Sequence, residues 1–166
     1  MYFETIDIEN IAIGPEEVGN NGNKYRKVSL NGQQFQNVQL GSSLQDLIRC
    51  PFGAESVTPD QPDKLCMKID ANDKLTNFIT QLDRKVVDAV NDSSLVHRST
   101  LRTGGVSNNM KIRLLPETQV LTTTLRDENS MTTPKAGTLQ DIVPNSMILP
   151  IVKIIGGVYF VEQNYG

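Results

Sequence analysis

The basic side chains of this chain gather in the segments that its sequence pattern predicts as strands. The 166 residues include 19 acids and 16 bases, yet every Asp, Glu, Lys or Arg within those segments is a base. A row of fixed cations is how proteins hold a polyanion, because each cation that meets a phosphate releases a condensed counterion. The segments are 24–40, 64–69, 110–115, 118–126 and 147–155, and their bases are Lys24, Arg26, Lys27, Lys64, Lys68, Lys111, Arg113, Arg126 and Lys153.

Alternation along a strand predicts which of these bases reach solvent. Lys64 and Lys68 alternate with apolar residues that face inward, so both point outward. Lys111 and Arg113 alternate with apolar residues in the same way. By this count the candidates for phosphate contacts are Lys27, Lys64, Lys68, Lys111, Arg113 and Lys153.

Aromatic residues among these bases offer surfaces on which a nucleobase can stack. Stacking contributes about 1 to 3 kcal/mol per base and needs an unpaired base, so it favours a single strand over a duplex. A place in the core is the alternative for each ring, and protection of sheet edges against aggregation is the alternative for the lysines. The stacking candidates are Tyr25, Phe52, Tyr159 and Phe160.

The sequence contains no recognisable catalytic or metal-binding constellation. Its one histidine, His97, stands in a polar stretch, and Cys50 and Cys66 lack the paired spacing of a zinc site. No glycine-rich phosphate loop or serine-nucleophile motif occurs. We therefore expect two reduced thiols and a binding protein without catalytic residues, metal or cofactor.

The sequence predicts one amphipathic helix, and elsewhere it predicts short strands separated by turns and loops. Residues 72–90 repeat apolar side chains at three- and four-residue spacing after an Asp- and Asn-bearing cap region. Asn31-Gly32 predicts a tight hairpin, and 147–162 predicts a terminal hairpin that turns at Gly156-Gly157. We predict a mainly β fold with one long helix, namely an OB-fold-like β-barrel with extra strands and long loops.

The predicted barrel is a single domain over 24–166, preceded by an acidic arm and loop over 1–23. This arm has no base, and it either competes with ligand for the basic face or is a solvated tail. The start lacks the basic end of a secretory signal, and no apolar stretch reaches the roughly 20 residues that span a bilayer. We expect an intracellular protein without a membrane anchor. The acids of the arm are Glu4, Asp7, Glu9, Glu16 and Glu17.

Several short motifs occur in an order that one family shares. They are the Asn31-Gly32 hairpin, Cys50-Pro51-Phe52-Gly53, the strand 65–69, Phe78 with Leu82-Asp83, Lys111-Ile112-Arg113-Leu114, the run 149–154 and Val158-Tyr159-Phe160. Over 25–166 this order resembles the single-stranded-DNA-binding proteins of large DNA viruses of algae, and more remotely phage replication proteins with an OB-fold. The resemblance implies an OB-fold that coats single-stranded DNA during replication, with the aromatic residues of the terminal hairpin near the strand.

We therefore predict a non-enzymatic, sequence-tolerant single-stranded-DNA-binding protein of DNA replication or recombination. Its further expected partners are replication proteins and other copies of the chain. The alternative is a viral or phage structural protein of the capsid or tail, a β-sandwich whose Thr-rich strands and long loops serve subunit contacts. An enzyme with an unrecognised site is a third alternative. The leading prediction requires that the outward cations form one continuous surface.

Overall fold

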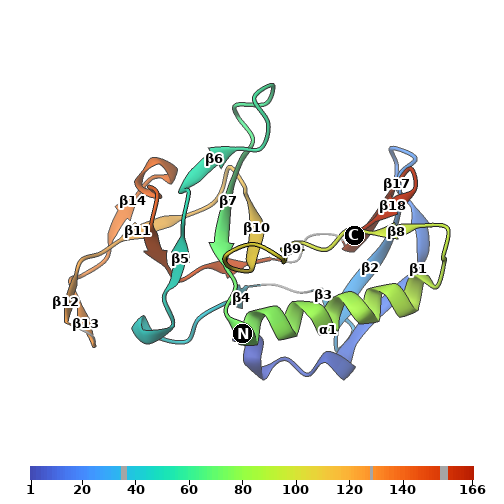
Figure 1. Ribbon diagram of the computed structural model, residues 1–166, viewed down its shortest axis with the longest axis horizontal. Helices are drawn as coiled ribbons and strands as arrows, with labels where there is room; N and C mark the ends of the chain where they lie inside the picture. The colour runs from blue at the N-terminus through green and yellow to red at the C-terminus, as the bar shows by residue number, and fades with distance from the viewer. Residues whose placement is uncertain (35–36, 128, 154–156) are drawn as a thin grey trace. The chain divides into compact units, whose positions relative to one another are not determined.

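The computed structural model describes residues 1–34, 37–127, 129–153 and 157–166. This part of the chain has one α-helix among many short strands, which confirms the predicted mainly β class with one long helix (Figure 1). The chain divides into two compact units, each built from segments that are far apart in sequence. Unit 1 comprises Met1–Leu40, Asn72–Leu101 and Ile151–Gly166, and unit 2 comprises Gly41–Ala71 and Arg102–Pro150.

The main sheet of unit 1 is formed by β1 (Ile11–Val18), β2 (Lys24–Leu30), β3 (Gln33–Gln34), β8 (Val96–His97), β17 (Gly157–Val161) and β18 (Asn164–Tyr165). The strand order is β1-β2-β17-β18-β8, and β3 pairs with β2. Every pair is antiparallel except β18 with β8. The predicted turn at Asn31-Gly32 is confirmed, because both residues have the positive φ that it requires, 51° and 75°.

The helix α1 (Asp73–Val90) belongs to unit 1 and matches the predicted span. The Asn72 side chain accepts a hydrogen bond of 2.9 Å from the backbone N–H of Leu75, which caps the first turn. Asn91 ends the helix in the left-handed conformation, with φ of 47°. The buried side chains of α1 recur at helical spacing and are Leu75, Ile79, Val86 and Val90.

Residues 1–18, part of the expected acidic arm, are structured elements of unit 1. The 3-10 helices η1 (Phe3–Thr5) and η2 (Ile8–Asn10) pack with β1 against α1. Phe3 is only 2% exposed, and its ring meets that of Phe78 edge to face with centroids 5.7 Å apart. The N-terminal segment therefore contributes to the core of unit 1.

Unit 2 is a set of separate small sheets. They contain β5 (Ile48–Cys50), β6 (Ala54–Ser56), β7 (Leu65–Asp70), β10 (Asn109–Leu114), β11 (Val120–Thr122), β12 (Leu125–Asp127), β13 (Ser130–Met131), β14 (Lys135–Gly137) and β15 (Ser146–Ile148), with the 3-10 helices η3 (Leu44–Asp46) and η4 (Leu139–Asp141). Here β6, β7 and β10 are adjacent, whereas β11 pairs with β14, β12 with β13, and β15 with β5. β9 (Leu101–Arg102) lies where the chain passes from unit 1 to unit 2. The described strands are not closed into a barrel.

The prediction of a terminal hairpin over 147–162 is wrong. β15 pairs with β5, and β16 (Ile151–Val152) pairs with β4 (Val38–Gln39). β17 pairs with β2 and β18 instead. Alternation identifies strands but does not determine which strands pair, and residues 154–156 of the predicted turn lie outside the described residues.

No helix in the described ranges has the length and apolar character to cross a membrane.

Truncation of Phe3 to alanine tests the place of the N-terminal segment in the core. We expect Phe3→Ala to lower the free energy of unfolding by about 3 to 5 kcal/mol, because it leaves a cavity against Phe78. Urea unfolding followed by circular dichroism measures the change. Phe52→Ala is the matched control, since the Phe52 ring is 56% exposed and its loss leaves no cavity. Equal stability of the two variants would contradict the core position of Phe3.

Candidate nucleic-acid interface

The pairing of β7 with β10 places three predicted cations on one face of a sheet. In this antiparallel register Lys68 lies opposite Lys111, and Cys66 lies opposite Arg113. Residues opposite each other in such a pair lie on the same face of the sheet. Along one strand, every second residue lies on the same face. Lys68, Lys111 and Arg113 therefore project from one side of the sheet, as their alternation predicts.

Lys64 extends the same row beyond the start of β7. The backbone N–H of Val57 donates to the carbonyl of Lys64 at 2.7 Å, which continues the pairing of β6 with β7 by one residue. By alternation Lys64 falls on the side of Lys68, and its side chain is exposed. We call Lys64, Lys68, Lys111 and Arg113, together with Phe52, the basic face.

Phe52 is the aromatic member of the basic face. It lies in the short connection between β5 and β6, and the ammonium of Lys68 is 5.0 Å from its ring centroid, within reach of a cation–π contact. The connection turns at Gly53, where φ is 73° and a Cβ atom would come within 2.5 Å of the carbonyl oxygen of Ile142. Glycine at position 53 therefore lets the chain present the Phe52 ring to solvent.

The acids near the basic face neutralise only part of its charge. The Glu55 carboxylate lies 3.4 Å from the Lys68 ammonium. The Asp70 carboxylate forms an ion pair with Arg49, with 2.7 Å between Oδ2 and Nε. Lys111 and Arg113 are exposed, and within the described ranges neither side chain has an ion pair. Two lysines directly opposite each other repel and cost stability. Lys111 and Arg113 thus leave positive charge that an anionic ligand can neutralise.

A second group of predicted residues lies on unit 1. Tyr25 and Tyr159 are opposite each other on β2 and β17, and their rings stack with centroids 5.9 Å apart and planes 26° apart. Lys27 is two residues along β2 on the same face, and its ammonium lies 2.9 Å from a Glu17 carboxylate oxygen. We call Tyr25, Lys27 and Tyr159 the tyrosine face.

Hydrogen bonds in the tyrosine face shift the pKa values of its members. The Tyr25 hydroxyl donates to the Glu17 carboxylate at 2.9 Å. Hydrogen bonds from Lys27 and Tyr25 hold the pKa of Glu17 below its usual value, and the same bonds raise the pKa values of Lys27 and Tyr25. Lys27 is thus already neutralised by an acid of its own unit, unlike Lys111.

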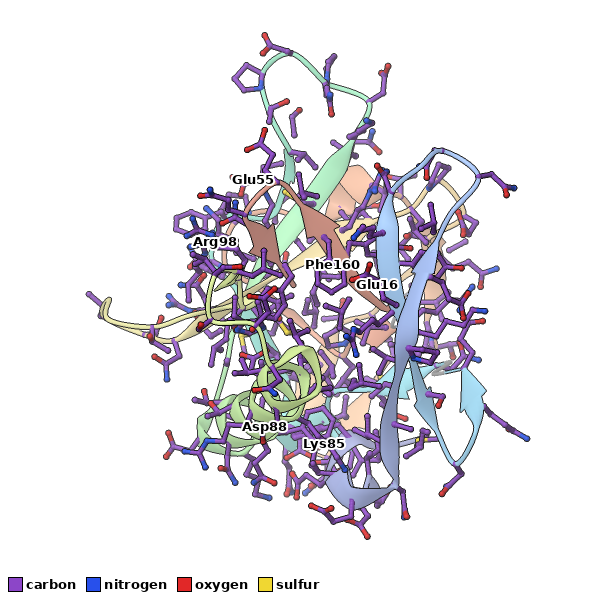
Figure 2. The ribbon with its side chains drawn as sticks, turned by 90° about the vertical axis from the view of Figure 1, so that its right-hand side faces the viewer. Glu16, Glu55, Lys85, Asp88, Arg98 and Phe160 are labelled. Carbon is purple, nitrogen blue, oxygen red and sulfur yellow. The ribbon has the colours of Figure 1, made fainter. Side chains whose placement is uncertain are left out.

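The structure does not unite all the predicted residues on one sheet. The basic face belongs to a sheet of unit 2 and the tyrosine face to a sheet of unit 1, so in the described residues the predicted cations do not lie on one closed sheet. Phe160, labelled in Figure 2, lies on the opposite side of β17 from Tyr159 and stacks on buried Tyr165 with centroids 5.9 Å apart. Phe160 therefore packs within unit 1. Lys153 follows β16 and is exposed, in neither group.

Two residues near these faces were missed from the sequence. Arg49 lies outside the segments predicted as strands, although buried Ile48 and Cys50 flank it in the alternation of a strand. Glu17 was counted only as part of an acidic arm. The alternation of apolar and polar residues does not predict which side of β1 Glu17 faces, because the bulge between Ile13 and Glu16 interrupts it.

The thiols are buried in unit 2, and Cys66 lies on the side of β7 from which Lys68 projects. Cys50 and Cys66 are both buried and free. Burial raises the pKa of the Cys50 thiol, although backbone N–H groups of Gly53 and Phe52 act in the opposite direction. In the described ranges no group of three or more His, Cys, Asp or Glu side chains is placed to hold a metal ion.

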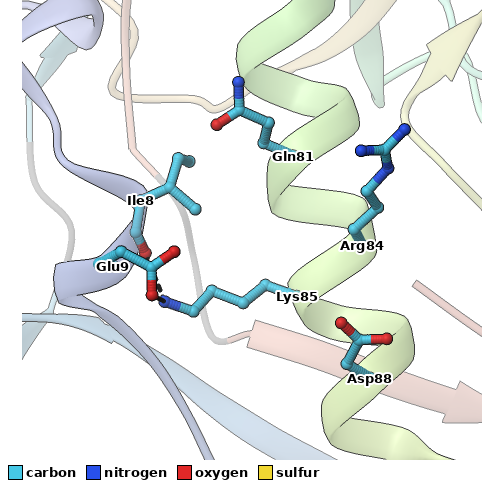
Figure 3. A pocket seen from close by; sticks show the side chains of 6 residues that line it. All are labelled: Ile8, Glu9, Gln81, Arg84, Lys85 and Asp88. Carbon is cyan, nitrogen blue, oxygen red and sulfur yellow. Dashed lines mark hydrogen bonds and ion pairs between the residues drawn. The ribbon is translucent and has the colours of Figure 1, made fainter.

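Polar contacts of α1 fasten other segments of unit 1 to the helix. A pocket of about 200 Å³ lies between η2 and α1 and is lined by Ile8, Glu9, Gln81, Arg84, Lys85 and Asp88 (Figure 3). Lys85 donates to the carbonyl of Ile8 at 2.6 Å and lies 3.5 Å from the Glu9 carboxylate, so its charge is engaged. The Asp83 carboxylate holds the segment after the helix, since Ser99 donates to it at 2.5 Å and His97 lies 3.6 Å away.

Comparisons of this chain with protein-family models, with curated proteins and with solved structures found no match. Function is therefore inferred from the chemistry of the two faces.

Reversal of one charge on the basic face tests the repulsion between its lysines. We expect Lys111→Glu to raise the free energy of unfolding by about 0.2 to 1 kcal/mol, because an opposite-charge pair replaces Lys68 opposite Lys111. Urea unfolding measures the change. Lys135→Glu is the control, since Lys135 is exposed on β14 opposite the uncharged Thr122. A lower stability for Lys111→Glu than for the control would contradict the repulsion.

Proposed function

We propose that this protein binds single-stranded DNA without sequence preference, in replication or recombination, and that it is not an enzyme. The observation that carries the proposal is the placement of Lys68 opposite Lys111, next to Arg113 on the same face. A cross-strand pair of like charges lowers the stability of a sheet, and a bound phosphate backbone reverses this effect. The basic face is thus better suited to a polyanion than to water alone.

The nature of the other side chains favours a single strand. Phe52 is exposed beside the cations, and a ring in that position stacks on an unpaired base at about 1 to 3 kcal/mol. Stacking and phosphate contacts need no particular base, which accounts for the absence of sequence preference. The resemblance to the single-stranded-DNA-binding proteins of algal viruses supports the same ligand. On the same resemblance we propose an OB-like fold.

A second candidate function, that of a structural protein of a virus or phage, is favoured by the hairpin of β11, β12, β13 and β14. Its apolar side chains Leu121, Leu125 and Met131 are exposed, and Leu125 lies opposite Met131 on one face. A two-stranded hairpin is marginally stable by itself, so such an arm is typical of a segment that packs against another subunit. Concentration-dependent assembly without DNA, measured by sedimentation, would support this candidate.

Titration with fluorescent oligo-dT at increasing salt tests the DNA-binding proposal. Single strands lose about 0.7 in log affinity per log unit of salt for each phosphate contact. We expect Lys111→Gln/Arg113→Gln to weaken binding to every sequence alike and to flatten the salt slope by about 1.4, because two contacts are lost. Anisotropy measures both quantities.

The matched control is Arg126→Gln/Lys135→Gln. It removes the same charge from exposed residues of the hairpin, away from the basic face. Absence of wild-type binding at low salt would refute the proposal. Equal effects of the two double variants would show that total charge matters and that the basic face is not the site.

A further inference from the structure

The tyrosine face is the uncovered side of the unit 1 sheet. Val28 and Val158 are buried on the other side, and Arg26 on that side donates to the carbonyl of Ala89 in α1 at 3.0 Å. The helix therefore covers the side of Arg26, whereas Tyr25 and Tyr159 project from the side away from it. Tyr159 is 43% exposed. Since β2 and β17 are inner strands of this sheet, the stacked rings lie within an open face and not at an edge.

A carboxylate occupies the polar end of this aromatic pair. One oxygen of Glu17, Oε2, lies 2.9 Å from the Lys27 ammonium and accepts the Tyr25 hydroxyl at 2.9 Å. An oxygen held between an ammonium and a phenol has the position and charge that a phosphate oxygen would take there. The aromatic surface of Tyr159 remains open beside it, and its hydroxyl makes no hydrogen bond with the described residues.

We propose that the tyrosine face is a second binding site for a nucleotide of the strand, with a base on Tyr159 and a phosphate on Lys27, and that Glu17 occupies the phosphate position until the strand displaces it. The inference rests on the proposed function in taking single-stranded DNA as the ligand. It adds a site on unit 1 and an intramolecular competitor that weakens binding to it.

Glu17, the proposed competitor, carries a negative charge at neutral pH. The hydrogen bonds of Lys27 and Tyr25 keep the pKa of Glu17 below its usual range, so Glu17 is a carboxylate at neutral pH. A phosphate must therefore displace an anion before it meets Lys27. Removal of that anion frees Lys27 for one more phosphate contact.

The test compares Glu17→Gln with Glu16→Gln. Both variants remove one negative charge from β1, and in the wild type both residues pair with a lysine, at 2.9 Å to Lys27 and 2.8 Å to Lys24. Glu16, labelled in Figure 2, lies opposite Arg26 in the register, and hence on the side of the sheet that faces α1. Glu16→Gln thus reproduces the change of charge without opening the tyrosine face.

We expect Glu17→Gln to bind oligo-dT about three- to tenfold more tightly at low salt, with a salt slope steeper by about 0.7, as one added phosphate contact requires. Glu16→Gln should change the affinity less than twofold. Tighter binding by both variants to the same extent, or no change in either, would overturn the inference. Fluorescence anisotropy of the labelled oligonucleotide measures the affinities.

Removal of the ring tests the stacking half of the site. We expect Tyr159→Leu to weaken oligo-dT binding by about 5- to 100-fold, since stacking on one base is lost, and Tyr159→Phe to bind as the wild type does. The chain has four tyrosines and no tryptophan, so quenching of tyrosine emission by the strand is measurable and should decrease in Tyr159→Leu. Equal affinity and quenching in Tyr159→Leu and Tyr159→Phe would overturn the site. Circular dichroism checks that both variants are folded.

The variants of the two faces distinguish a failure of the second site from a failure of the proposed function. If Lys111→Gln/Arg113→Gln weakens binding while Glu17→Gln and Tyr159→Leu match the wild type, the basic face binds DNA and the second site is refuted. If Glu17→Gln strengthens binding while the double variant matches the wild type, the second site is supported and the basic face is refuted. Absence of binding in the wild type and in Glu17→Gln refutes both.

Discussion

The antiparallel register of β7 and β10 is the constraint on which the basic face depends. Ile69 and Met110 are opposite each other and buried, and Leu114 at the other end is buried as well. A slip of one residue would turn these apolar side chains toward the opposite face and Lys111 toward the interior. Burial of the apolar face therefore determines that two lysines meet on the other face. The repulsion between them is maintained by packing on the apolar face of the sheet.

The acids of the N-terminal segment pair with lysines of unit 1. Glu4, Glu9, Glu16 and Glu17 all lie within 3.5 Å of a lysine ammonium in unit 1, those of Lys74, Lys85, Lys24 and Lys27 respectively. Most of these pairs are exposed and contribute little to stability, so their main effect is on where positive charge remains available. A net charge of −3 for the whole chain is therefore compatible with an uncompensated cationic face on unit 2.

Local sequence patterns predicted the helix and the faces of single strands. The predicted and observed folds differ in strand pairing, which depends on contacts between distant segments. Helical spacing over 72–90 and the alternation around Lys68 and Lys111 predicted α1 and the shared side of the two lysines. The assignment of these strands to one sheet and of Lys27 to another depends on pairing between distant segments, which no local period encodes. Phe160 is a different case, because it follows Tyr159 directly and adjacent residues of a strand face opposite sides. Alternation alone could have excluded one of the two rings from the open face.

Protection of sheet edges does not account for the basic face. Lysines that prevent aggregation are useful on edge strands, where unpaired backbone groups would otherwise recruit another chain. Lys68 is on β7, an inner strand of its sheet, which pairs with β10 over its whole length and with β6 over 65–67. Lys135 on β14 fits the protective role better, because β14 belongs to a two-stranded ladder with one edge open. The proposed anionic ligand, lying across both strands, would give a reason for the position of Lys68 opposite Lys111.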